Sequence, residues 1–150
     1  GCDALNDTAV LRIRSIKHRD NKPFSVIAPS LDWIKHNAIL NQHALRWIDK
    51  LPGPYTLVLP LRDPSCLSPH VISIQQSIGV RIPDHWISEI VSDIGRPIIT
   101  TSVNLTGQKA CNTLEEFKQF SVDFVLYEGP KSGSPSSIVR LIEGEEIIRR

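Results

Sequence analysis

Strand-like and helix-like segments alternate through the first two thirds of this 150-residue chain, and further strand-like runs follow near its end. β-branched and aromatic runs mark the strands, and apolar residues three or four apart mark the helices. The expected strands cover residues 24–28, 55–61, 78–82, 97–102, 124–127, 138–142 and 146–149. The expected helices cover residues 8–17, 31–34, 44–50, 85–94 and 114–120. This order predicts an α/β or α+β fold, with helices on the faces of a sheet.

Polar residues at the expected helix starts support this reading. Asn6 or Asp7 is expected to cap the first helix, because their side chains accept hydrogen bonds from free backbone N–H groups. Asp84 is expected to cap the helix that precedes Gly95 in the same way. Thr113 and Glu116 have the spacing of a capping box, in which each side chain bonds the other residue's backbone.

The composition excludes several classes of protein. Hydrophobic residues make up 41% and charged residues 22%, which fits one globular domain spanning residues 1–150. The net charge is only +1, so any nucleic-acid contact must come from a local patch. No apolar run approaches the roughly 20 residues of a membrane span. Cys2, Cys66 and Cys111 are too scattered for a disulfide framework or a zinc site, which favours a reducing, cytoplasmic location.

The stretch "IKHRDNKPFSV", residues 16–26, nearly matches a kinase catalytic loop, but Ser25 stands where a kinase needs Asn to hold magnesium. The chain also lacks a G-x-G-x-x-G loop, which excludes a kinase. What remains is a basic cluster opposed only by Asp20. This cluster comprises Arg12, Arg14, Lys17, His18, Arg19 and Lys22. Its cations could stabilise a helix C-terminus through the helix dipole, or they could clamp a polyphosphate.

A polar sequence, "TTSVNLTG" at residues 100–107, follows the apolar strand expected at 97–102. Ser102 and Asn104 would face the same side of an extended segment. Ligands of α/β proteins bind where strands end, so these side chains are candidates for gripping a polar ligand. The alternative is a polar turn in which both side chains bond their own backbone.

Arg81 stands in an expected strand, "SIGVRIPDH", among apolar neighbours. Alternation along the strand puts Gly79 and Arg81 on one face, and the glycine leaves room for a ligand beside the arginine. A half-buried guanidinium requires an anion, and a carboxylate matches its fork. The sequence leaves open whether that carboxylate belongs to a ligand or to the protein, with Asp84 and Glu89 as the protein candidates.

Seven short motifs follow one another in a recognisable order: "GCDA", "IKHRDNKP", "PGPYT", "GVRIPDH", "TTSVNLTG", "SPSSIV" and "IIRR". Each is weak alone, but together they resemble the YrdC-type threonylcarbamoyl-adenylate synthase family over essentially the whole chain. The resemblance implies an α/β fold with a twisted, mostly open mixed sheet, helices on its faces and a concave basic surface. It also implies a nucleotidyltransferase that joins L-threonine, bicarbonate and ATP into threonylcarbamoyl-AMP and releases pyrophosphate. A partner enzyme then transfers the threonylcarbamoyl group to an adenosine beside the tRNA anticodon.

The same resemblance implies roles for individual residues. Lys17 and Arg19 are expected to meet the ATP phosphates as the catalytic cations. The expected ATP-binding residues are Arg19, Lys22, Ser77, Asn104, Asn112 and Arg149. The expected threonine-binding residues are Arg81, Ser102 and Ser136. Magnesium would arrive with ATP, and no metal site of the protein's own is expected.

The chain departs from the family pattern at three points. Residues 1–7 show no leading strand, and the family's strand with its Pro-Thr-x-Thr-x-Tyr-Gly-Leu signature is expected just before Gly1. The spacing from Lys17 to Pro23 is one residue shorter than the pattern. The chain has Pro-Ser-Ser at 135–137, whereas the family often has Glu-Ser-Thr or Pro-Ser-Thr. The first departure predicts that a catalyst needs residues beyond this sequence.

Two alternatives remain open at this point. The first is a non-catalytic module that binds double-stranded RNA or tRNA with the same basic face, although aromatic residues make up only 6% and give little support for base stacking. The second is a carbamoyl-adenylate-forming relative that uses carbamoyl phosphate in place of threonine. The synthase reading also implies the tRNA threonylcarbamoyl transferase machinery as a partner, a possible RNA contact and no membrane.

Overall fold

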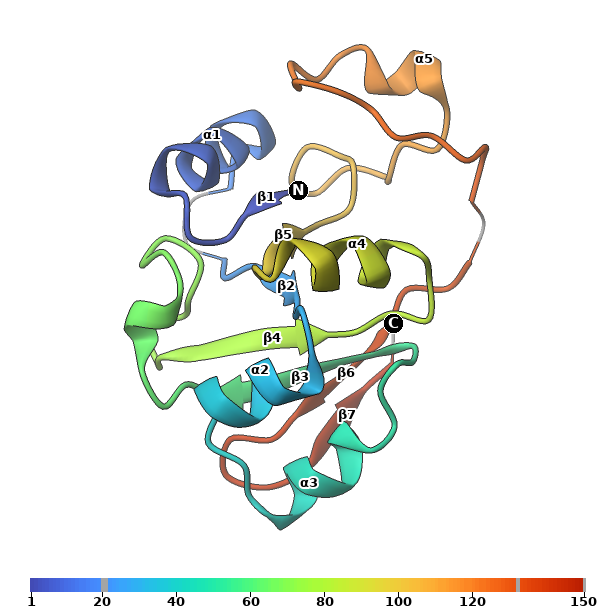
Figure 1. Ribbon diagram of the computed structural model, residues 1–150. Coiled ribbons are helices and arrows are strands. Elements are labelled where there is room, and N and C mark those ends of the chain that lie inside the picture. The colour runs from blue at the N-terminus through green and yellow to red at the C-terminus, as the bar shows by residue number, and fades with distance from the viewer. Residues whose placement is uncertain (20–21, 132, 150) are drawn as a thin grey trace.

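The computed structural model describes residues 1–19, 22–131 and 133–149, so Asp20 lies outside the described residues. Within them, seven strands form one sheet in the order β1-β5-β2-β4-β3-β6-β7 (Figure 1). The strands are β1 Cys2–Asp3, β2 Ser25–Ile27, β3 Tyr55–Pro60, β4 Ser77–Arg81, β5 Ile98–Thr100, β6 Ser137–Arg140 and β7 Glu146–Ile148. The helices are α1 Asp7–Lys17, α2 Leu31–Asn37, α3 Gln42–Ile48, α4 Ile87–Ile94 and α5 Leu114–Phe117, with a 3-10 turn η1 Pro64–Cys66.

The sheet is mixed, which confirms the predicted fold class. β2 pairs with β4 in parallel, as does β3 with β6, and the other neighbouring strands run antiparallel. As a result, the end of β4 lies beside the start of β3, and the start of β6 lies on the other side of β3. This topology brings Arg81, at the end of β4, close to residues that come much earlier and much later in the chain.

One face of the sheet carries the hydrophobic core. The strand registers align Ile99, Val26, Val80, Leu57 and Val139 in one row across β5, β2, β4, β3 and β6. None of these five side chains is exposed. Complete burial of each such side chain stabilises the fold by roughly 1.5–3 kcal/mol, so this row holds the central strands together.

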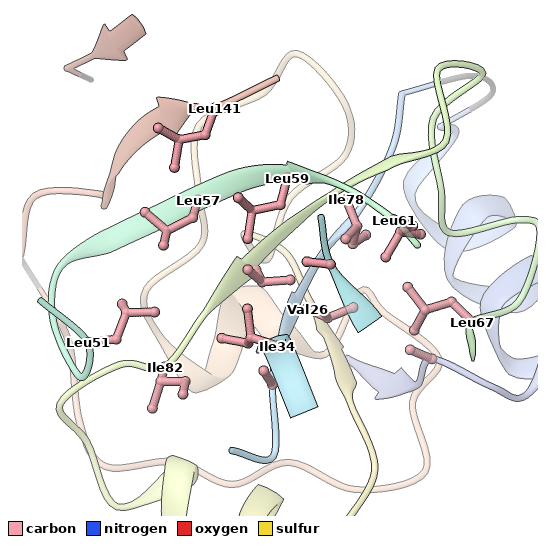
Figure 2. Packing of buried hydrophobic residues seen from close by; sticks show 14 of the residues in the cluster. Val26, Ile34, Leu51, Leu57, Leu59, Leu61, Leu67, Ile78, Ile82 and Leu141 are labelled. Carbon is pink, nitrogen blue, oxygen red and sulfur yellow. The ribbon is translucent and has the colours of Figure 1, made fainter. Parts of the chain in front are cut away.

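Helices α2 and α3 contribute to the same core. Ile34 of α2 and Ile48 of α3 belong to the buried cluster that contains the row of strand residues. Figure 2 shows Leu57 and Leu59, two residues apart on β3, directed toward the same side of the strand. This is the alternation expected of a strand with one buried face.

Most of the expected helix-start signals are confirmed. The side chain of Asn6 accepts a hydrogen bond from the Ala9 N–H at the start of α1, over 3.0 Å. Thr113 and Glu116 form the predicted capping box of α5. The capping role of Asp84 is wrong, because α4 begins at Ile87 and the residue before it, Trp86, provides no side-chain cap.

The strand predictions need two corrections. No leading strand was expected, but Cys2 and Asp3 form β1 and pair with Ile99 and Ile98 of β5. A two-residue strand is too short to show any alternation in the sequence, so only its pairing reveals it. Residues 124–127 are not a strand, although their composition favours one, because they do not join the ladder of the sheet. Phe124 remains 75% exposed there.

Candidate functional site

The face of the sheet opposite the core carries polar groups around Gly79. The registers place Ser25 of β2 directly beside Gly79, and Thr100 of β5 directly beside Ser25. A Cβ at position 79 would lie 2.6 Å from the Ser25 Oγ atom and 3.1 Å from the Thr56 Cγ2 atom. Glycine is therefore required here by the close approach of two hydroxyl-bearing side chains. The room for a ligand that was expected directly at Gly79 is instead filled by the Ser25 and Thr56 side chains.

Arg81 is half-buried on this face, and its Nε group donates a hydrogen bond to the Thr100 Oγ1 atom over 3.1 Å. Burial lowers the pKa of the Arg81 guanidinium. No carboxylate of the described residues forms an ion pair with Arg81, so the suggested partners Asp84 and Glu89 do not fill that role. The terminal nitrogens of Arg81 thus suit a carboxylate from outside the protein.

Ser136 lies on the same side of the sheet, bound to a residue that the sequence reasoning missed. The Thr56 Oγ1 and Ser136 Oγ atoms lie 2.8 Å apart and share a hydrogen bond. Thr56 is buried and stands next to Tyr55, which pairs with Ser137 at the start of β6. The only sequence signal for Thr56 was its hydroxyl in "PGPYT", because its pairing depends on a residue 80 positions away.

Lys17, at the end of α1, is buried, and its ammonium group is fully engaged by the loop after β5. The Nζ atom donates to the Ser102 carbonyl over 2.6 Å, to the Asn104 carbonyl over 2.6 Å and to the Asn104 Oδ1 atom over 2.9 Å. Burial, followed by the nearby charge of Arg19, lowers the pKa of Lys17. In return, the Thr106 hydroxyl donates to the Lys17 carbonyl over 2.9 Å.

The structure brings Ser102 and Asn104 together with Lys17 in a hydrogen-bonded turn. The Ser102 hydroxyl donates to the Asn104 Oδ1 atom over 2.7 Å, and the Asn104 amide donates to the Gln108 carbonyl over 2.6 Å. The polar turn that the sequence left open is therefore present. A cavity of about 120 Å³ adjoins it and is lined in part by Lys17, Ser102 and Asn104.

Three other residues of the basic cluster, Arg14, Arg19 and Lys22, differ in their surroundings. Arg19 donates to the carbonyls of Lys22 and Pro23, and its guanidinium lies 4.9 Å from the centre of the Phe24 ring. Arg14 lies 4.7 Å from the same ring, on which it can also stack as a cation. The side chain of Lys22 is exposed, which leaves its charge accessible to a ligand.

The structure does not bring every expected ATP-binding residue to these groups. Ser77 is buried at the far end of β4 from Arg81, where its hydroxyl shares a hydrogen bond with that of Ser73 over 2.8 Å. The Asn112 Oδ1 atom accepts a hydrogen bond from the Lys131 N–H over 2.5 Å. Arg149 is exposed just after β7. Their proposed contacts with a nucleotide remain predictions.

The described residues contain no candidate metal site, and the thiol of Cys2 is unreactive. No group of three or more His, Cys, Asp or Glu residues in residues 1–19, 22–131 and 133–149 could hold a metal ion. Burial raises the pKa of Cys2 to about 11, so this thiol is protonated at neutral pH. In the same described ranges, no helix is long and apolar enough to cross a membrane.

The fold and this polar face together define a mixed α/β domain that carries Arg81 and several hydroxyl-bearing side chains on the sheet face opposite the core. Comparison with known proteins identifies the family: the family model for Sua5, YciO and YrdC, described as "Telomere recombination", matches residues 1–150. The chain belongs to the Sua5/YciO/YrdC family.

Individual relatives match along nearly the whole chain. A relative from Methanocaldococcus jannaschii is 36% identical over 152 residues, which cover 97% of this chain and 70% of that protein. A relative from Vibrio vulnificus, named threonylcarbamoyl-AMP synthase, is 32% identical and covers 100% of this chain and 84% of that protein. The structure of full-length HypF in the phosphate- and nucleotide-bound form matches with a TM-score of 0.82 at 26% identity, over 99% of this chain and 24% of HypF.

Proposed function

We propose that this chain is an L-threonylcarbamoyladenylate synthase, a nucleotidyltransferase that forms threonylcarbamoyl-AMP and pyrophosphate from threonine, bicarbonate and ATP. Relatives with the name threonylcarbamoyl-AMP synthase, 31–32% identical along almost the whole chain, support this activity. The observation that carries the proposal is Arg81. It is a half-buried cation without an ion-pair partner among the described residues, on a face rich in hydroxyl groups. A free amino acid supplies the missing carboxylate.

The reaction consists of two condensations. The threonine amine attacks bicarbonate, which gives a carbamate and releases water. A carbamate oxygen then attacks the α-phosphorus of ATP, and the bond to pyrophosphate breaks. Both steps develop negative charge on oxygens, and fixed cations and hydroxyl donors stabilise such charge. Holding the substrates together also removes much of the entropic barrier.

One group of residues is proposed to bind the threonine part of threonylcarbamoyl-AMP, and another group its nucleotide part. Arg81 binds the threonine carboxylate, and Ser136 and Ser102 contribute hydroxyl groups on the amino-acid side. Arg19, Lys22, Asn104 and the other residues expected at the nucleotide would hold ATP. Full-length HypF, of which 24% matches this chain at 26% identity, has a nucleotide-bound form, and this agrees with nucleotide use among proteins that contain this fold. Magnesium enters with ATP as part of the substrate and offsets the phosphate charge.

We further infer that the product serves the tRNA threonylcarbamoyl transferase machinery, because a mixed anhydride of this kind is an activated donor for group transfer. A cytoplasmic location follows from the same proposal, since the three scattered cysteines suit a reducing compartment. A direct RNA contact would require a local basic patch, because the net charge is only +1.

The testing experiment is pyrophosphate release from ATP and Mg²⁺ by the purified protein, produced with the leading strand that the family pattern places just before Gly1. We expect release only when threonine and bicarbonate are both present, together with a nucleotide product of the mass of threonylcarbamoyl-AMP. Release that needs carbamoyl phosphate instead of threonine would identify a carbamoyl-adenylate-forming enzyme. Salt-sensitive RNA binding without pyrophosphate release would identify a binding module.

A further inference from the structure

The hydrogen bond between Arg81 and Thr100 crosses an intervening strand of the sheet. Arg81 ends β4 and Thr100 ends β5, with β2 between them, so the two residues belong to strands that do not pair. In the registers, Ile27 of β2 stands beside Arg81, whereas Thr100 stands beside Ser25. The Arg81 side chain must therefore lie over β2 to bring its Nε atom within 3.1 Å of the Thr100 Oγ1 atom.

This hydrogen bond decides which edge of the guanidinium is presented to a ligand. A guanidinium can grip a carboxylate through Nε and one terminal nitrogen, or through both terminal nitrogens. Thr100 occupies the Nε–H, so the first mode is blocked and the two Nη groups remain. The planar group is also prevented from turning about its last bonds, which reduces the entropy lost when a ligand binds.

We propose that Thr100 is a positioning residue that sets Arg81 for end-on capture of an amino-acid carboxylate. The proposal rests on the proposed function, in which Arg81 binds threonine, and it adds a residue that the expected threonine set did not contain. Thr100 acts through Arg81 and need not touch the substrate. It therefore governs affinity for the carboxylate and has no part in ATP binding.

The variant Thr100→Val tests this proposal, because valine keeps the branched shape in the strand and removes only the hydroxyl. We expect threonine to bind about tenfold more weakly by calorimetry, which is the scale of one well-placed hydrogen bond to a charged group. The KM for ATP and the melting temperature should stay unchanged. Thr100→Ser, which restores a hydroxyl, should recover most of the affinity, and Thr8→Val on the exposed face of α1 serves as the control.

A double-mutant cycle separates positioning from direct contact. In an Arg81→Met background, Thr100→Val should cause no further loss of threonine affinity, since its effect passes through Arg81. Threoninol, which lacks the carboxylate, should bind the wild type and Thr100→Val equally. A further loss in the Arg81→Met background, or unchanged threonine affinity in Thr100→Val alone, would overturn the positioning role and leave the synthase activity standing. Absence of any threonine binding to the wild type would overturn both.

Discussion

The ammonium group of Lys17 is fully hydrogen-bonded within the protein itself. An ammonium group has three protons to donate, and Lys17 gives them to two backbone carbonyls and one side-chain oxygen of the loop after β5. A role at the ATP phosphates remains a prediction for this residue. The geometry adds a second role, which is to hold Ser102 and Asn104 in place beside the adjoining cavity.

Replacing Lys17 with methionine should therefore damage the loop. Lys17→Met keeps the apolar part of the side chain but removes the ammonium donor from the Ser102 and Asn104 carbonyls, which costs about 1.5–3 kcal/mol, the scale of hydrogen bonds to a charged group. We expect a loss of this size in urea unfolding, and weaker binding of both ATP and threonine. Lys35→Met, at an exposed lysine of α2, is the matched control. Unchanged stability in Lys17→Met would show that the loop does not depend on this ammonium group.

At the scale of elements, the long segment between α5 and β6 is attached to the start of α4 through Glu128. The Glu128 carboxylate accepts a hydrogen bond from the Trp86 Nε1–H. Its Oε2 atom lies 3.0 Å from the His85 Nε2 atom and 3.4 Å from the Lys131 Nζ atom. The hydrogen bond from Trp86, followed by those of Lys131 and then by the charges of Lys131 and His85, lowers the pKa of Glu128. The described residues of this segment, 118–131 and 133–136, form no strand of the sheet, and Glu128 joins the segment to the start of α4, which follows β4 and Arg81.

The attachment should depend on pH in a definite direction. A lowered carboxyl pKa means that the stabilisation is present above the ordinary glutamate value and is lost as the pH falls through the lowered pKa. We expect Glu128→Gln to speed amide hydrogen exchange in residues 118–131 at neutral pH, and the difference from wild type to disappear in acid. Glu115→Gln, which removes an exposed pair with Lys118, should leave exchange near Trp86 unaltered. Equal exchange in wild type and Glu128→Gln at neutral pH would contradict the attachment.

For the whole molecule, the proposed function predicts that one face of the sheet carries the stability of the fold and the other face binds the ligand. Leu57→Ala removes a fully buried side chain from the core row and should lower the free energy of unfolding by about 2–5 kcal/mol. Ser25→Ala, on the opposite face, should change it by no more than about 0.5 kcal/mol. Chemical unfolding of both variants checks this, and threonine affinity of folded Leu57→Ala should match the wild type. Similar losses from both variants would mean that the polar face also carries the fold.

The sequence by itself determined the order of most helices and strands, most helix starts and the strand position of Arg81, because these depend on the spacing of nearby residues. Asn6, the capping box of Thr113 and Glu116, and the alternation around Gly79 are local signals of this kind. The family could be inferred as well, since its motifs keep their order along the chain.

Only the tertiary structure decided which residues meet. The pairing of β1 with β5, the exclusion of residues 124–127 from the sheet and the contacts of Arg81 with Thr100 and of Thr56 with Ser136 all depend on strand order and register. A strand needs a partner edge as well as β-forming residues, and a side chain finds its hydrogen-bond partner through the fold. Neither condition is encoded in the neighbouring sequence. The sequence therefore predicted Arg81 as a binding residue but could not predict its hydrogen bond to Thr100.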